Sequence, residues 1–127
     1  LIALGKTISG DTSKFKEAEL LSTLGAMYAR KAAFNSTNPR KAGTYTSIGF
    51  RYLDRAIIKY PENITARINR GITASSVPEF MHKTDVAKED LTFVIQSTSF
   101  ANLPSTLRTR IKSTLDKINN RIQANKK

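Results

Sequence analysis

The stretch from Tyr45 to Gly71 has the sequence YTSIGFRYLDRAIIKYPENITARINRG, and it decides the fold that we expect for the whole chain. In its first half, apolar and small residues recur at steps of three and four, which places them along one face of a helix. Pro61 ends that helix, and Asn63 is suited to cap a second helix that returns along the first. We therefore predict two antiparallel helices packed through small residues. The stripe consists of Tyr45, Ile48, Gly49, Tyr52, Leu53, Ala56, Ile57 and Tyr60.

Helical spacing recurs on both sides of this hairpin. The capping-type residues Asp11-Thr12-Ser13 begin a predicted amphipathic helix that continues to about Phe34, and turn-forming residues then lead to Gly43. Further along, Thr84 or Asp85 is expected to cap a fourth helix. The predicted helices span residues 12–34, 44–60, 64–76, 84–97 and 104–123.

No segment gives a convincing strand pattern. The run Thr92-Phe93-Val94-Ile95 has local strand propensity, but a lone strand would leave its backbone groups unpaired, so we assign it to a helix. Pro104 lies where a helix tolerates proline, in the first turn of the last helix. The sequence therefore predicts an all-α chain of about five helices that forms a single domain over residues 1–127.

Length and composition narrow the class of protein. A chain of 127 residues, 39% hydrophobic and 24% charged, suits one globular domain with a real core. No apolar run approaches the roughly 20 residues of a membrane-spanning helix. The absence of Cys excludes disulfides and thiolate chemistry. The chain lacks an initiator Met and begins with only four apolar residues, so we expect a processed or trimmed chain without an intact signal peptide.

The formal net charge of +11 predicts affinity for an acidic partner, whether nucleic acid, anionic lipid or an acidic protein segment. A solvated basic face explains the same charge, because Arg and Lys stems cover apolar helix surface, and no recognition-helix motif is present. The apolar residues of the last helix approximate a heptad row and are a candidate homodimer seam. The candidate anion-binding residues are Arg51, Arg55 and Lys59 on the second helix and Arg110, Lys117 and Arg121 on the last.

Apolar and small residues follow a similar pattern in two successive predicted hairpins. The pattern comprises Leu21, Leu24-Gly25 and Tyr28, then Gly49, Leu53, Ala56 and Pro61, then Asn69-Arg70-Gly71, and finally Ala87, Leu91 and Val94. It resembles the tetratricopeptide-repeat family of helical-hairpin scaffolds. The spacing departs from the family's pattern, because Gly25 and Gly71 are 46 positions apart (71 − 25) where the repeat period is about 34. We therefore expect a divergent member, with the excess absorbed between Phe34 and Gly43.

This resemblance implies an α-α superhelix that binds a protein or peptide in a concave groove, with an acidic partner among the candidates and the last helix as a cap. Arg30 and Asn69 are the expected main contacts, because a guanidinium holds a carboxylate and a carboxamide holds a backbone amide. The family's groove positions correspond to Ser22, Thr23, Ala26 and Arg30 in the first helix and to Thr65, Ile68, Asn69, Ile72 and Ser76 in the third.

The segment from Val77-Pro78 to Asp90-Leu91 also resembles a group of poorly characterised, often exported bacterial proteins. This second resemblance favours an exported or periplasmic location over a cytoplasmic one. It implies nothing about chemistry.

Catalysis is not expected, because the chain lacks a convergent set of acid, base and nucleophile. His82 is the only histidine, and Glu79, His82 and Asp85 would converge on a metal only if their loop were helical. Loop polarity explains these residues better. Gly-rich phosphate loops and nucleophile elbows are also absent from the sequence. We therefore predict no enzyme activity, no cofactor and no metal site.

Overall fold

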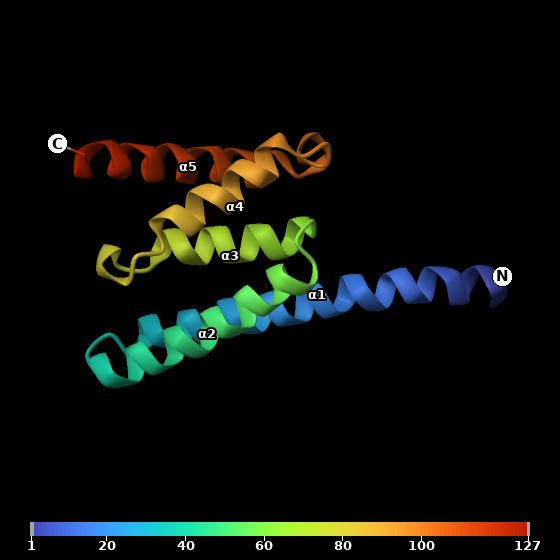
Figure 1. Cartoon of the computed structure of the whole chain (residues 1–127), viewed down its shortest axis with the longest axis horizontal. Coiled ribbons are helices and arrows are strands. Elements are labelled where there is room, and N and C mark those ends of the chain that lie inside the picture. The colour runs from blue at the N-terminus through green and yellow to red at the C-terminus, as the bar shows by residue number, and fades with distance from the viewer. Residues whose placement is uncertain (1, 127) are drawn as a thin grey trace. The chain divides into compact units, whose positions relative to one another are not determined.

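The computed structural model describes residues 2–126, and their side chains from Lys16 onward. This part of the chain is all-α, with 84% of the chain helical and no strand among residues 2–126. Contacts divide it into two compact units, the first ending at Ala66 and the second beginning at Arg67. In chain order the elements are α1 (Ile2–Phe34), α2 (Pro39–Lys59), α3 (Ile64–Ser76), η1 (Glu79–Met81), α4 (Thr84–Gln96), η2 (Phe100–Asn102) and α5 (Ser105–Asn125) (Figure 1).

The first unit is an antiparallel hairpin of α1 and α2, which lie side by side. The connection is short because Asn38 caps α2, with its Oδ1 accepting a hydrogen bond from the Lys41 backbone N–H at 3.3 Å, and Pro39 follows as the first helical residue. At the other end of the hairpin, Glu17 pairs with Lys59, the last residue of α2. The part of α1 before Lys16 therefore continues beyond the end of α2 (Figure 1).

The two helices approach each other most closely at a pair of glycines. A Cβ atom on Gly25 would lie 2.6 Å from the Gly49 carbonyl oxygen and 2.6 Å from Leu53 Cγ. A Cβ on Gly49 would lie 2.7 Å from the Gly25 carbonyl oxygen. Side-chain carbon atoms do not occupy such distances, so the hairpin depends on the absence of a side chain at both positions. Leu53 is fully buried at this contact, and Ala56 is fully buried further along the predicted stripe.

Tyrosines line one side of the same helix pair. The Tyr28 ring stacks on Tyr52, with centroids 5.8 Å apart and planes 10° apart, and it lies 6.4 Å from the Tyr45 ring. Lys31 Nζ is 4.8 Å from the centroid of the Tyr45 ring, within range of a cation–π contact. Aromatic pairs of this kind add about 0.5–1.5 kcal/mol beyond the area they bury.

In the second unit a similar glycine contact joins α3 to α4. A Cβ on Gly71 would lie 2.8 Å from Leu91 Cδ2, and Leu91 is fully buried. The helix α5 contacts α4. Ile111 and Ile118, seven residues apart on α5, are also buried. The first helix of each unit therefore carries a glycine against which a leucine of the next helix packs.

A buried ionic cluster also holds α3 to α4. Asp90 is fully buried, and Arg70 binds its carboxylate through both Nε (2.6 Å) and Nη2 (2.9 Å). Arg67 Nη1 donates to the same carboxylate at 2.9 Å, and its guanidinium lies 4.5 Å from the centroid of the Phe93 ring. Two cations thus share one buried anion, and Glu89 adds a second carboxylate 3.5 Å from Arg67. The charges are paired and hydrogen-bonded, as burial requires.

Several sequence predictions of the fold are confirmed. The α3 bounds coincide with the predicted 64–76, and Asn63 caps this helix, with its Oδ1 accepting the Ala66 N–H at 2.9 Å. The strand-like run from Thr92 to Ile95 is helical.

Two predicted helix starts and one predicted cap were wrong. The helix α1 begins at Ile2 rather than near residue 12, because capping-type residues are tolerated inside a helix whose preceding residues are also helical. The helix α2 begins at Pro39 rather than 44, because the Asn-Pro pair caps and opens a helix instead of extending a loop. Neither Thr84 nor Asp85 caps α4, since Lys83 holds the cap position without a side-chain cap bond.

Replacing Gly25 with alanine should lower the free energy of unfolding by about 1–3 kcal/mol, because the new methyl group overlaps backbone atoms of α2 that cannot turn away. Gly43 is the matched control, since nothing lies within 4 Å of a Cβ placed there. Gly43→Ala should stabilise the chain by about 0.5–1 kcal/mol through helix propensity alone. Urea unfolding followed by circular dichroism measures both; equal effects would contradict the close packing.

Asp90→Ala should lower the free energy of unfolding by about 3–5 kcal/mol, because it leaves two buried guanidinium groups without their carboxylate. Asp116→Ala is the control, since Asp116 is exposed on α5, and its effect should stay within about 0.5 kcal/mol. Thermal unfolding of the two variants and the wild type tests the difference. A small effect of Asp90→Ala would mean that the ionic cluster does not stabilise the second unit.

Candidate functional site

The outward side of α1 carries an exposed apolar row. Leu20, Met27 and Phe34 are 60%, 56% and 88% exposed, and they are seven residues apart. Seven residues make nearly two helical turns, so the three side chains form a line about 21 Å long on one side of the helix. Isolated exposed apolar residues are normal, but three large ones in register on one side of a helix are a candidate interaction surface. We call these three residues the outer row.

Polar and basic side chains alternate with the outer row. Thr23 and Arg30 are exposed, and each lies three residues after one row member and four before the next. Lys16 is exposed four residues before Leu20, so it occupies the same alternation. No ion pair joins Lys16 or Arg30 to a carboxylate among the side chains that the structure describes. We define the outer face as Lys16, Leu20, Thr23, Met27, Arg30 and Phe34.

Of the groove residues predicted in the first helix, Thr23 and Arg30 belong to the outer face. Ser22 and Ala26 do not. Ser22 is buried, and its hydroxyl donates a hydrogen bond to the Glu19 carbonyl oxygen at 3.3 Å. Ala26 is half-buried. The structure therefore brings two of the four α1 candidates together on one exposed side.

The groove residues predicted on α3 are less exposed. Thr65 lies at the end of the first unit, and the others belong to the second. Ser76 is exposed and donates its hydroxyl to the Ile72 carbonyl oxygen at 3.0 Å. Those that are half-buried are Thr65, Ile68, Asn69 and Ile72.

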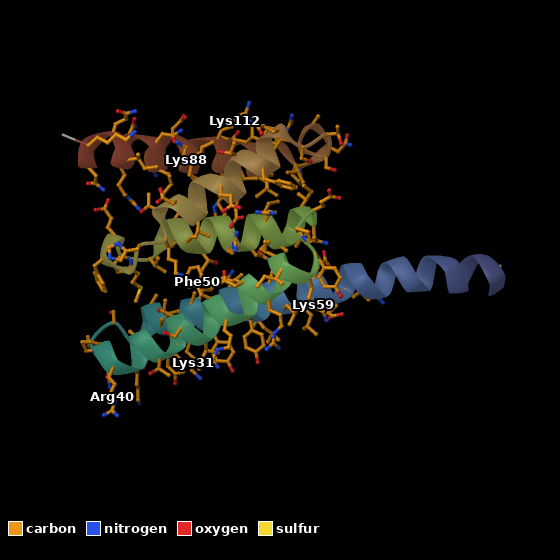
Figure 2. All side chains as sticks on the ribbon, viewed as in Figure 1. Lys31, Arg40, Phe50, Lys59, Lys88 and Lys112 are labelled. Carbon is orange, nitrogen blue, oxygen red and sulfur yellow. The ribbon has the colours of Figure 1, made fainter. Side chains whose placement is uncertain are left out.

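Each predicted anion-binding row has a cation that is held by a carboxylate. Lys59, which lies where α2 ends alongside α1, pairs with Glu17 at 2.5 Å (Figure 2). Arg121 Nε lies 3.0 Å from Glu79 Oε1. The other members of the two rows, Arg51, Arg55, Arg110 and Lys117, are exposed.

The apolar row of α5, which was the predicted homodimer seam, lies largely inside the chain. Ile111 and Ile118 are fully buried, and Leu115 and Ile122 are half-buried. The helix α5 contacts α4, so its apolar side is used within the second unit. The fully buried members of the heptad row therefore pack within the second unit.

The predicted loop polarity around His82 is consistent with the structure. His82 adopts left-handed backbone angles (φ 59°, ψ 43°) and ends η1, where its N–H donates to the Glu79 carbonyl oxygen at 2.9 Å. The Glu79 side chain is the partner of Arg121. Among the described side chains, no group of three His, Cys, Asp or Glu residues could hold a metal ion.

One pocket in the second unit lies beside the ionic cluster. The charges of its lining residues cancel, because Arg67 and Lys88 are positive and Asp85 and Glu89 are negative. The pocket therefore has no net charge that would select a ligand. Arg67 is already bound to Asp90. The remaining lining residues are Thr92, Phe93 and Gln96. Within residues 2–126, none of the helices has the length and hydropathy needed to cross a membrane.

The outer row was not predicted from the sequence. Leu20 and Met27 lie off the apolar stripe that packs the hairpin, and Phe34 was noted only as a helix end. The signal that was available is the seven-residue spacing of three large apolar residues outside the main stripe. Spacing alone does not reveal exposure, because a second apolar line on a helix can equally be covered by another element.

Two residues at the end of α2 bind the carboxylate of Glu17. It accepts hydrogen bonds from Lys59 Nζ and from the Tyr60 hydroxyl, each at 2.5 Å. The bond from Lys59 is the main cause that holds the pKa of Glu17 below its usual 4.5, and Tyr60 adds to it. The bond to Glu17 raises the pKa of Lys59 above 10.5 and the pKa of Tyr60 above 10.0.

These shifts predict a pH dependence of the hairpin on both sides of neutrality. The pKa of Glu17 is lower in the folded chain than in the unfolded chain. Its contribution to the stability of the hairpin is therefore present above pH 4.5 and is lost as the pH falls through the lowered pKa. Because the pKa values of Lys59 and Tyr60 are raised, their contributions are present below pH 10 and are lost as the pH rises through the raised values. In a plot of melting temperature against pH, Glu17→Gln should reduce the slope on both the acid side and the alkaline side. Glu62→Gln, an exposed control, should leave both slopes unchanged.

No protein-family model, curated protein or solved structure matches this chain. The resemblance to tetratricopeptide repeats therefore depends on the sequence residues that carry it.

Proposed function

We propose that the chain is a noncatalytic scaffold that binds a protein or peptide partner along the outer face of α1. The observation that carries this proposal is the outer row, in which three large apolar side chains on one helix are exposed to solvent. Burying a side chain of this size against a partner is worth about 1.5–3 kcal/mol. Met, Phe and Arg are also types enriched at interfaces, and all three occur on the outer face.

The packing of α1 supports such a role. The helix is held by the glycine contact with α2 and by the tyrosine stack, so its outward side is fixed before any partner arrives. A rigid surface loses little conformational entropy on binding. The repeated contact of Gly25 with Leu53 and of Gly71 with Leu91 also supports divergent tetratricopeptide-like hairpins, with α5 as the terminal helix that caps the second.

A second candidate function is binding of nucleic acid or an anionic membrane surface. The exposed Arg51 and Arg55, one turn apart on α2, favour it together with the net charge of +11. The pairing of Lys59 with Glu17 weakens it, because it leaves fewer uncompensated cations in that row. Such binding would fall steeply with ionic strength, whereas an apolar contact would change little.

The triple variant Leu20→Ser, Met27→Ser, Phe34→Ser tests the proposal. Affinity capture from source extract, quantified by mass spectrometry at low and high salt, should show one or more proteins that bind the wild type and are lost by at least about tenfold from the triple variant. Ile58→Ser is the matched control, since Ile58 is 80% exposed but lies on α2. All these side chains are exposed, so each variant should keep its stability within about 0.5 kcal/mol per site.

Retention of the same proteins by the triple variant would contradict the proposal. The double variant Arg51→Glu, Arg55→Glu tests the second candidate function, the binding of nucleic acid or an anionic membrane surface. Loss of nucleic acid from this variant at low salt, with no protein lost from the triple variant, would favour the second function instead.

A further inference from the structure

We infer that the partner segment is an acidic amphipathic α-helix that packs lengthwise along α1. This inference rests on the proposed function and names the chemistry of its partner. Its basis is the alternation of the outer face, whose members follow one another at steps of four and three residues. That spacing is the a/d pattern of a coiled-coil seam, and it fits the ridge of another helix.

The width of the outer face argues against a flat surface as the occupant. An amphipathic helix that lies on a membrane presents an apolar stripe about 100° wide or wider. On α1 the outer row is one side chain wide, and Thr23 and Arg30 interrupt it. A narrow line of knobs flanked by polar groups leaves little apolar area for a bilayer, but it matches the holes between the side chains of one facing helix.

The charge of the outer face selects an acidic partner. Lys16 and Arg30 lie in the seam itself, and Lys31 follows four residues after Met27 on its edge. Two carboxylates of α1 lie near the seam: that of Glu17 is held by Lys59 and Tyr60, and Glu19, which is half-buried, precedes Leu20. Burying the seam therefore requires carboxylates from the partner, and Arg30 can bind one of them in a bidentate manner.

A second copy of this chain does not meet that requirement. Two copies would bring four cations, Lys16 and Arg30 of each, against only the two Glu19 carboxylates near the seam, so cations would lose water without gaining a partner charge. The complementary helix should instead carry leucine-like residues at seven-residue intervals. Its Glu or Asp residues should lie three or four positions from each apolar one.

The test uses a fluorescein-labelled helical peptide of about three heptads with Leu at each d position, Glu at each a position and Ala elsewhere. Fluorescence anisotropy with the full chain should show binding that weakens with salt and is weaker by at least about tenfold for the same peptide with Lys in place of Glu. The double variant Lys16→Glu, Arg30→Glu should reverse this preference and bind the Lys peptide better. Arg51→Glu with Arg55→Glu has the same net charge as that variant but keeps the outer face, so it should retain the preference for the Glu peptide.

Equal binding of the two peptides, or an unchanged preference in the Lys16→Glu, Arg30→Glu variant, would overturn the inference. Sedimentation with phosphatidylglycerol vesicles is the third arm. Vesicle binding that depends on Leu20, Met27 and Phe34 would also overturn it, in favour of a lipid surface. If the serine triple variant still loses its captured protein while the two peptides bind equally, the proposed function stands and the inference about the partner fails.

Discussion

The absence of side chains at Gly25 and Gly49 is the constraint on which the first unit depends. With backbone from the two helices this close, Leu53 fills the space beside Gly25, and Tyr28 comes within stacking distance of Tyr52. The contact also fixes how α1 is rotated about its axis. One side of α1 faces α2, and the opposite side, which carries Leu20 and Met27, stays in water. The candidate binding surface is thus a consequence of the hairpin packing.

Charge in this chain serves structure as well as solubility. Arg67 and Arg70 are committed to the buried carboxylate of Asp90, and Lys59 and Arg121 are paired with Glu17 and Glu79. Because these four cations are paired with the carboxylates of Glu17, Glu79, Glu89 and Asp90, the paired groups cancel in the formal net charge of +11. The positive excess therefore lies on the other Lys and Arg residues, which an acidic partner can meet. Lys16 and Arg30 on the outer face form no ion pair with a side chain from Lys16 onward, so they are better placed to act in recognition.

The proposed partner surface and the helical-hairpin scaffold fit together physically. Packing on its inner side fixes α1 in place, so its outer face presents apolar and basic groups in a fixed register. A partner helix would then lose entropy mainly on its own side, which limits the cost of association. Small residues occupy the close contact between α1 and α2. The large side chains of the outer face lie on the other side of α1, because they do not fit into that contact.

The sequence by itself determined the helical class, the corner at Pro61, the Asn63 cap and the bounds of α3, because periodicity and capping are local properties of the chain. It did not determine that the Asn38-Pro39 pair opens α2, since the same residues also suit a loop. Only the tertiary structure decided that Asp90 is buried between two arginines and that Leu20, Met27 and Phe34 are exposed. A sequence pattern assigns a residue to a side of a helix, but which side is covered depends on contacts between segments far apart in the chain.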